Sequence, residues 1–195
     1  MSLHQRLRAA TASSHQGLED ALDWRARVAS LPGYRALLAR FHGFHAAYEP
    51  AIGLALADEA FWGPRRRFAA LAADLAHLGM PDAEIATLPR PSAVTFADEA
   101  AAMGALYVLE GSTLGGQVIG RHIGAVHGLT QAGLAYYHAH GRQTGVMWNA
   151  FRARLDRLSG DPEAEAAALA TGTATFDALR IWLCAPDSSA ACGGG

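Results

Sequence analysis

Lysine is absent from this 195-residue chain, because all 16 basic residues are arginine. A chain without lysine cannot form a Schiff base with a carbonyl substrate, and it cannot carry a Walker-type phosphate loop, which requires a lysine. Nine histidines remain, and imidazole serves both as a metal ligand and as an acid or base near neutral pH. We therefore expect chemistry that runs through histidine, carboxylate or a bound cofactor.

Cysteine is scarce as well, since the chain has only Cys184 and Cys192, both near its C-terminal end. They can build neither a disulfide framework nor a CxxC zinc site, which favours a reduced, cytoplasmic protein. The first residues enter an amphipathic pattern without the apolar core of a signal peptide. No apolar run approaches the ~20 residues of a membrane span, so we expect no membrane partner.

Charge of one sign is also lacking: 16 basic and 18 acidic residues leave a net charge of −2. The longest basic run is Arg65, Arg66 and Arg67, which argues against nucleic acid or an anionic membrane as the main partner. With 51% hydrophobic residues and eight prolines, the chain predicts one compact domain over residues 1–185. Residues 186–195 are small and polar and are expected to form a disordered tail.

Helical periodicity dominates the rest of the chain. Leu7, Thr11, His15, Leu18 and Leu22 follow one another in steps of three or four, which predicts an amphipathic helix with a histidine in its apolar stripe. No alternating strand pattern occurs, so we expect an all-α bundle of about seven or eight helices. Further helices are expected from Ser30 with a kink or break near Pro50, over 65–78, from about 95–98 to His127, over 143–158, and from Asp161 to Leu183.

Seven glycines lie between positions 104 and 128, inside one expected helix. Each glycine in a helix costs ~1 kcal/mol relative to alanine, so the cluster requires a reason. One interpretation is close packing, because Gly116, Gly120 and Gly124 are spaced by four and would form a smooth groove for a neighbouring helix.

The other interpretation concerns Gly111, Ser112, Gly115 and Gly116, where missing side chains would let the backbone approach a flat ligand. A helix poor in side chains that faces a helix bearing a histidine would form a slot. Its occupant would be planar, wide and largely apolar, and it would carry a metal that the histidine reaches.

Two segments resemble signatures of the heme oxygenase family. Residues 7–19 resemble the proximal helix of that family, and residues 107–117, with the run Glu-Gly-Ser-Thr-Leu-Gly-Gly, resemble its distal signature. The form of the distal run is similar to the bacterial enzymes that make biliverdin for bacteriophytochromes. Segments 141–145 and 148–151 also resemble that branch, so the resemblance covers residues 3–183 and implies a multi-helix heme oxygenase-like bundle.

The resemblance makes His15 the axial ligand of heme iron. A neutral imidazole would bind iron through one nitrogen, while Glu19, one helical turn further on, could hold the other N–H. A histidine in an apolar stripe, taken without its context, would more often be a core residue.

Three further residues come from the same resemblance. Arg152 and Arg8 match positions at which the family places basic groups against the heme propionates, and the arginine fork suits a carboxylate. Either could instead be a solvated surface charge. Tyr107, at the start of the distal signature, is expected to line the same pocket, although a core tyrosine is the alternative.

The distal signature implies the catalytic positions. Gly111 and Gly115, with Gly116 beside them, match distal glycines whose backbone lies over the iron and leaves dioxygen room only along the heme plane. Ser112 stands where mammalian-type enzymes keep an aspartate that orders distal waters, and a hydroxyl can hold a water without buffering charge. Glu110 is expected to point elsewhere and receives no catalytic role.

A metal site of another kind is the competing interpretation. His42, His45 and Glu49 share one helical face, and the pair Asp74 and His77 has the spacing of half a di-iron site. A ferritin-like site needs a second such pair, which the chain lacks.

The resemblance implies an enzyme that cleaves heme, its cofactor and substrate, to biliverdin, carbon monoxide and ferrous iron. Because no flavin or nicotinamide motif occurs, electrons would come from an external donor such as a ferredoxin or a reductase. A bacteriophytochrome would receive the biliverdin. Two alternatives remain: a protein of this fold that binds or stores heme without degrading it, and an unrelated helical enzyme for a flat heterocycle.

Overall fold

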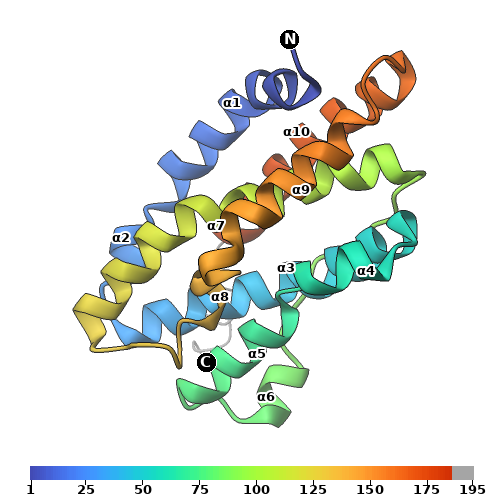
Figure 1. Ribbon diagram of the computed structural model, residues 1–195. Coiled ribbons are helices and arrows are strands. Elements are labelled where there is room, and N and C mark those ends of the chain that lie inside the picture. Colours follow the sequence, from blue (N-terminus) through green and yellow to red (C-terminus); the bar gives the residue numbers. More distant parts are fainter. Residues whose placement is uncertain (186–195) are drawn as a thin grey trace, which may run out of the picture.

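The computed structural model describes residues 1–185, apart from the side chains of Thr113 and Leu114, and all regular structure in that part is helical (Figure 1). The all-α prediction is confirmed. The expected tail and Cys192 lie outside the described residues. The elements are α1 (Leu3–Leu22), α2 (Trp24–Arg27), α3 (Leu31–Leu56), α4 (Glu59–Trp62), η1 (Gly63–Arg65), α5 (Phe68–His77), α6 (Asp82–Ala86), α7 (Glu99–His127), α8 (Ala135–His138), η2 (Gly141–Gln143), α9 (Thr144–Asp156) and α10 (Pro162–Cys184).

Two helix starts lie where the sequence predicts them. The Ser30 hydroxyl accepts a hydrogen bond from the Gly33 N–H at the start of α3, and the Asp161 carboxylate accepts from the N–H groups of Glu163 and Ala164 at the start of α10. Each cap satisfies amide groups that have no partner inside the helix, so the short polar side chain sets the boundary.

Other boundaries differ from the prediction. Helix α3 continues through Pro50 to Leu56 instead of breaking there. Pro50 lies on the exposed side of the helix, where a carbonyl that loses its backbone partner can bind water instead. The helix expected from Arg65 begins at Phe68, since residues 63–65 form the 3-10 turn η1. The short helices α2, α4, α6 and α8 were not predicted, because four or five residues cannot display a helical period.

The long helix α7 begins at Glu99, where the Asp98 carboxylate accepts from the Ala101 N–H, and it ends at His127 as predicted. Gly128 follows with φ of 69°, the left-handed conformation that commonly ends a helix. Within residues 1–185, no helix combines the length and apolar character that crossing a membrane requires.

Helix α10 packs against both α1 and α7, and small residues bring the three helices close together. A Cβ atom added at Gly172 of α10 would lie 2.8 Å from Leu7 Cδ2 and 3.4 Å from the Gly104 carbonyl oxygen. A Cβ atom at Gly104 of α7 would lie 2.3 Å from the Ala168 carbonyl oxygen. The backbones of α7 and α10 therefore touch, with Leu7 of α1 filling the space beside them.

We expect the substitution Gly104→Ala to destabilise the protein by about 1–3 kcal/mol through overpacking, despite the better helix propensity of alanine. The clash is with a backbone oxygen, which cannot rotate away. Thermal unfolding should show a lower midpoint. Gly145→Ala is the control, since a Cβ at Gly145 meets no atom within 4 Å. Equal midpoints for the two variants would contradict the close contact.

Candidate functional site

Helices α1 and α7 come together at two places. The first is the contact through Gly172, where Leu7 of α1 lies beside Gly104 of α7. The second lies just beyond the end of α1, where the Trp24 and His122 ring centroids are 5.3 Å apart, and His127 Nε2 donates to the Val28 carbonyl oxygen at 2.7 Å. The two helices thus run in the same direction. The part of α7 between the two contacts, from Gly104 to His122, is about 27 Å long at 1.5 Å rise per residue. We call the space between this part of α7 and the facing part of α1 the interval.

His15 lies on α1 in the interval between these contacts. Its side chain is 53% exposed, so it is not a core histidine, although its stripe neighbours Thr11 and Leu18 are buried. The ring packs edge-on against Phe176 of α10 at a centroid distance of 5.3 Å. His15 Nδ1 lies 3.8 Å from Glu19 Oε2, which leaves Nε2 as the nitrogen turned from that carboxylate.

Gly111 and Gly115 lie on α7 in the same interval. A Cβ atom built at either position meets no atom within 4 Å, so this side of α7 is open. Gly116 differs from expectation: it is buried, and its Cβ would lie 3.4 Å from Tyr137 Cδ1. The packing interpretation holds for Gly116 and also for Gly120, whose Cβ would lie 2.8 Å from Tyr137 Cβ. Gly124 belongs with them, since its Cβ would lie 2.8 Å from the Leu129 carbonyl oxygen.

Arg8 of α1 and Arg152 of α9 lie at the same edge of the interval, and both are exposed. The pKa of His4 between them is lowered, first by burial and then by the positive charges of Arg152 and Arg8. The His4 ring contacts Trp148 at 5.5 Å and Tyr107 at 6.1 Å between centroids. This edge therefore joins two exposed guanidinium groups to an aromatic wall that includes the half-buried Tyr107.

A hydrogen-bonded series of side chains lies behind α7. Ser112 Oγ donates to the Leu109 carbonyl oxygen at 2.6 Å and is also hydrogen-bonded to Tyr136. The Tyr136 hydroxyl lies 3.4 Å from His45 Nε2, and His45 Nδ1 lies 2.7 Å from Glu49 Oε1. Burial raises the pKa of Tyr136, so its hydroxyl keeps its proton at neutral pH.

The same series borders a small cavity of about 10 Å³. Its polar lining comes from Arg67, Ser112 and Tyr136. The Arg67 side chain is buried, and its Nη2 has no hydrogen-bond partner within the described part of the chain. A cavity of this size accommodates roughly one water molecule, which would accept a hydrogen bond from that nitrogen.

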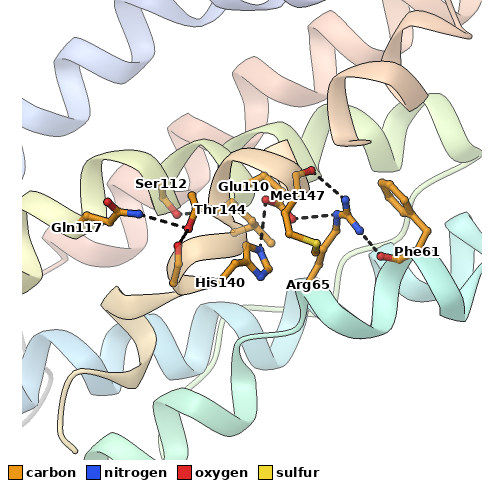
Figure 2. Close-up of polar contacts among 10 residues, drawn as sticks. Phe61, Arg65, Glu110, Ser112, Gln117, His140, Thr144 and Met147 are labelled. Carbon is orange, nitrogen blue, oxygen red and sulfur yellow. Dashed lines mark hydrogen bonds and ion pairs between the residues drawn. The ribbon is translucent and has the colours of Figure 1, made fainter. Parts of the chain in front are cut away.

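Glu110, which sequence reasoning turned away from the site, is buried on the closed side of α7. Its Oε1 lies 3.0 Å from Arg65 Nε, and its Oε2 lies 3.6 Å from His140 Nε2 (Figure 2). Further along α7, Gln117 Nε2 donates to Thr144 Oγ1 at 3.3 Å, at the start of α9. Polar contacts thus tie the closed side of the glycine segment to its neighbours.

Comparison with known proteins identifies the family of the chain. A family model described as heme oxygenase matches residues 1–184. A heme oxygenase of Xanthomonas campestris pv. campestris (strain 8004) is 34% identical over 157 residues, which covers 78% of this chain and 89% of that protein. The chain belongs to the heme oxygenase family. It is accordingly an enzyme of heme degradation.

Solved heme oxygenases share the fold. The NO- and CO-bound heme oxygenase from Neisseria meningitidis superposes with a TM-score of 0.77 at 23% identity, over 94% of this chain and 90% of the other. The heme oxygenase from Leptospira interrogans has a TM-score of 0.76 at 17% identity, over 94% and 99% of the two chains. Identities this low establish the common fold alone.

The residues in the interval fit the heme that the family implies. Heme is a flat apolar plate with a metal at its centre and two carboxylates on one edge. The interval offers an imidazole on α1, a face of α7 without side chains at Gly111 and Gly115, and two arginines at one edge. Each feature of heme would therefore find a suitable group here.

The competing metal candidates have structural partners in this heme oxygenase. Glu49 Oε1 accepts from the N–H groups of Arg67 at 2.6 Å and Phe68 at 3.0 Å, which begins α5. Asp74 accepts from the N–H groups of Ala135 at 2.9 Å and Tyr136 at 2.8 Å, which begins α8. In residues 1–185, no cluster of three or more His, Cys, Asp or Glu side chains is arranged to hold a metal ion.

Sequence reasoning missed the residues behind α7. His45 was interpreted only as a metal ligand, and Arg65 and Arg67 only as members of a basic run. Tyr136 and His140 were given no role in the site. A buried arginine or tyrosine carries no motif, because its partners come from segments far apart in the sequence. The available signal was chemical, since charged residues in an otherwise apolar helix require buried partners.

We expect Gly115→Leu to unfold at a temperature near that of the original protein, because the leucine enters open space. Gly120→Leu should destabilise the protein by about 1–3 kcal/mol, since the added atoms meet Tyr137. Thermal unfolding of the two variants measures this difference. A loss of stability at Gly115 as large as that at Gly120 would show that this side of α7 is packed.

Proposed function

We propose that this heme oxygenase cleaves heme with dioxygen and external electrons to biliverdin, carbon monoxide and ferrous iron. One observation carries the proposal: the half-exposed imidazole of His15 and the bare backbone at Gly111 and Gly115 lie in the same interval between α1 and α7. Bound heme would supply the iron that binds and activates dioxygen.

His15 would hold the iron from the α1 side. Its Nδ1 is oriented toward Glu19, so Nε2 would be the iron ligand, and the carboxylate would accept the Nδ1 proton. Arg8 and Arg152 would pair with the propionates, because a guanidinium forms two parallel hydrogen bonds with a carboxylate. Tyr107, beside Trp148, would contact the same edge of the plate.

Gly111 and Gly115 would lie over the opposite face of the plate. With no side chain there, dioxygen has room to bind, and the backbone restricts the direction in which it lies. Gly116, packed on Tyr137, would keep this backbone at its distance from α8 rather than contact heme itself.

Ser112 would deliver protons, supplied through Tyr136 and His45. Because Ser112 donates to the Leu109 carbonyl oxygen, its oxygen accepts the Tyr136 proton. His45 donates from Nδ1 to Glu49 and therefore offers Nε2 as a second acceptor for the same Tyr136 proton. The Tyr136 hydroxyl can therefore donate its proton either to Ser112 Oγ or to His45 Nε2. A water in the Arg67 cavity would replace a proton that Ser112 gives up.

The electron donor and the product acceptor would be separate proteins. The sequence has no flavin or nicotinamide motif, which supports an external donor such as a ferredoxin or a reductase. The form of the distal segment, similar to bacteriophytochrome-associated enzymes, supports a bacteriophytochrome as the recipient of biliverdin.

We expect purified protein mixed with hemin to show a Soret band that a reductant and dioxygen replace with the absorption of biliverdin. Chromatography of the product would identify the isomer. A heme complex that stays intact through repeated reduction, with a ferredoxin and a reductase each tried as donor, would favour heme storage over cleavage.

We expect His15→Ala to lose the spectrum of the histidine-ligated heme complex and to bind heme more weakly. Imidazole added to the solution should restore part of the spectrum, because it can occupy the vacated ligand position. His77→Ala, at the exposed end of α5, is the matched control and should leave the spectrum unchanged. An unaltered spectrum in His15→Ala would remove the ligand assignment.

We expect Tyr136→Phe to bind heme normally but to slow turnover at least about tenfold, since positioned proton donors contribute that much or more. Tyr137→Phe is the control, because Tyr137 is an equally buried neighbour that packs against Gly120. Single-turnover rates in H₂O and D₂O check the assignment. Equal rates and equal isotope effects in the two variants would exclude the relay.

A further inference from the structure

This inference rests on the proposed function, and it concerns what holds the bare segment of α7 in place. Gly111, Gly115 and Gly116 each lower helix stability by ~1 kcal/mol relative to alanine. The open side at Gly111 and Gly115 has no neighbouring atoms to support it. The position of this backbone must therefore be set by contacts on its closed side.

Glu110 provides the charged contact on that side. Its carboxylate lies between Arg65 Nε at 3.0 Å and His140 Nε2 at 3.6 Å, one partner on each oxygen. All three side chains are nearly inaccessible, at 3%, 3% and 7% exposure for Glu110, Arg65 and His140. Figure 2 shows the carboxylate of Glu110 pointing toward both partners, which come from either side of it.

Arg65 extends the contact to two further elements. Its two terminal nitrogens donate to the backbone carbonyl oxygens of Phe61 in α4 and Met147 in α9, the latter at 3.1 Å (Figure 2). Its guanidinium also lies over the Phe61 ring, 3.7 Å from the centroid. One side chain thus joins α4 and α9 through hydrogen bonds and α7 through an ion pair.

His140 secures the loop between α8 and α9. The residue before it, Ala139, has φ of 50° and ψ of −120°, a conformation that residues other than glycine rarely adopt. Such a backbone persists only where its surroundings hold it. The contact of His140 with Glu110 supplies that constraint and ties the start of α9 to α7.

We propose that Arg65, Glu110 and His140 are positioning residues, which set the height and rotation of the Gly111–Gly115 backbone over heme and thereby the carbon that is oxidised. The ion pair sets the distance between Arg65 and Glu110, and the hydrogen bonds from Arg65 to two backbone carbonyl oxygens fix the direction of its guanidinium, whereas apolar packing fixes distance alone. A small rotation of α7 would change where the open backbone faces the plate, without loss of the fold.

The competing explanation is that these three residues only stabilise the fold. Replacing the buried ion pair with apolar residues distinguishes a stabilising role from a positioning role. Apolar residues of similar volume often replace such a pair with no loss of stability, whereas removing one partner is strongly destabilising. The double variant Arg65→Met with Glu110→Leu should therefore fold and lose less stability than Glu110→Leu alone, its remaining loss coming from the Phe61 and Met147 carbonyl oxygens that no longer have Arg65 as a donor.

The test measures the position of the α7 backbone separately from the stability of the fold. In the heme-free double variant, we expect amide hydrogen exchange at residues 111–117 to rise about tenfold, because the ion pair that holds this segment from behind is lost. With heme bound, the C–O stretching frequency of the carbon monoxide complex should shift, and the biliverdin isomer mixture should change. Original exchange rates, stretching frequency and isomer mixture in a stable double variant would overturn the proposal.

Two further variants complete the design. His140→Leu removes a single contact and is expected to fold, with faster exchange at residues 111–117 and an altered isomer mixture; it decides the matter if the double variant does not fold. Arg6→Met with Glu165→Leu is the control, because that ion pair joins α1 to α10 and includes no residue of α7. Equal changes in the control would overturn a role specific to Glu110. If the unaltered protein does not cleave heme, the proposed function fails, while the exchange measurements still test the positioning.

Discussion

Helix α7 is held at both ends and along one side, and its remaining side is left without side chains. Backbone contact at Gly104 holds one end against α10, and the bond from His127 to Val28 holds the other. The open face at Gly111 and Gly115 then depends on the contacts behind it. This requirement explains why charged and polar residues are buried in a core that is otherwise apolar. Their ion pairs and hydrogen bonds hold the α7 backbone from behind, because no side chain packs against its open face at Gly111 and Gly115.

Two buried carboxylates both begin helices and hold side chains behind Ser112 in place. Glu49 accepts the amide groups that begin α5 and also binds His45, while Asp74 accepts the amide groups that begin α8 and so places Tyr136 behind Ser112. Burial raises the pKa of Asp74, so its carboxylate retains its role only because those amide groups donate to it. Two carboxylates that resemble metal ligands in the sequence thus orient the side chains of the proposed proton path.

The long helices and their starts could be predicted because their signals are local. An apolar stripe with a period near 3.6 and a capping Ser30 or Asp161 need no information from elsewhere in the chain. Pro50 could not be judged this way, since the break it suggests depends on whether the freed carbonyl meets water. The short helices α2, α4, α6 and α8 escaped prediction because four or five residues show no periodic stripe, and α8 begins where the distant Asp74 accepts its first amide groups.

By itself the sequence determined that the protein is helical, that a histidine stands on the first helix and that glycines interrupt a later one, because these features follow from residue type and spacing. Only the tertiary structure decided which glycines are open and which are packed: Gly115 meets no atom, whereas Gly120 meets Tyr137. It also decided that Glu110 is a buried anchor with Arg65 as its partner. Both outcomes depend on neighbours such as Tyr137 and Arg65, which folding brings from distant segments of the chain. The spacing of residues along one helix cannot predict such neighbours.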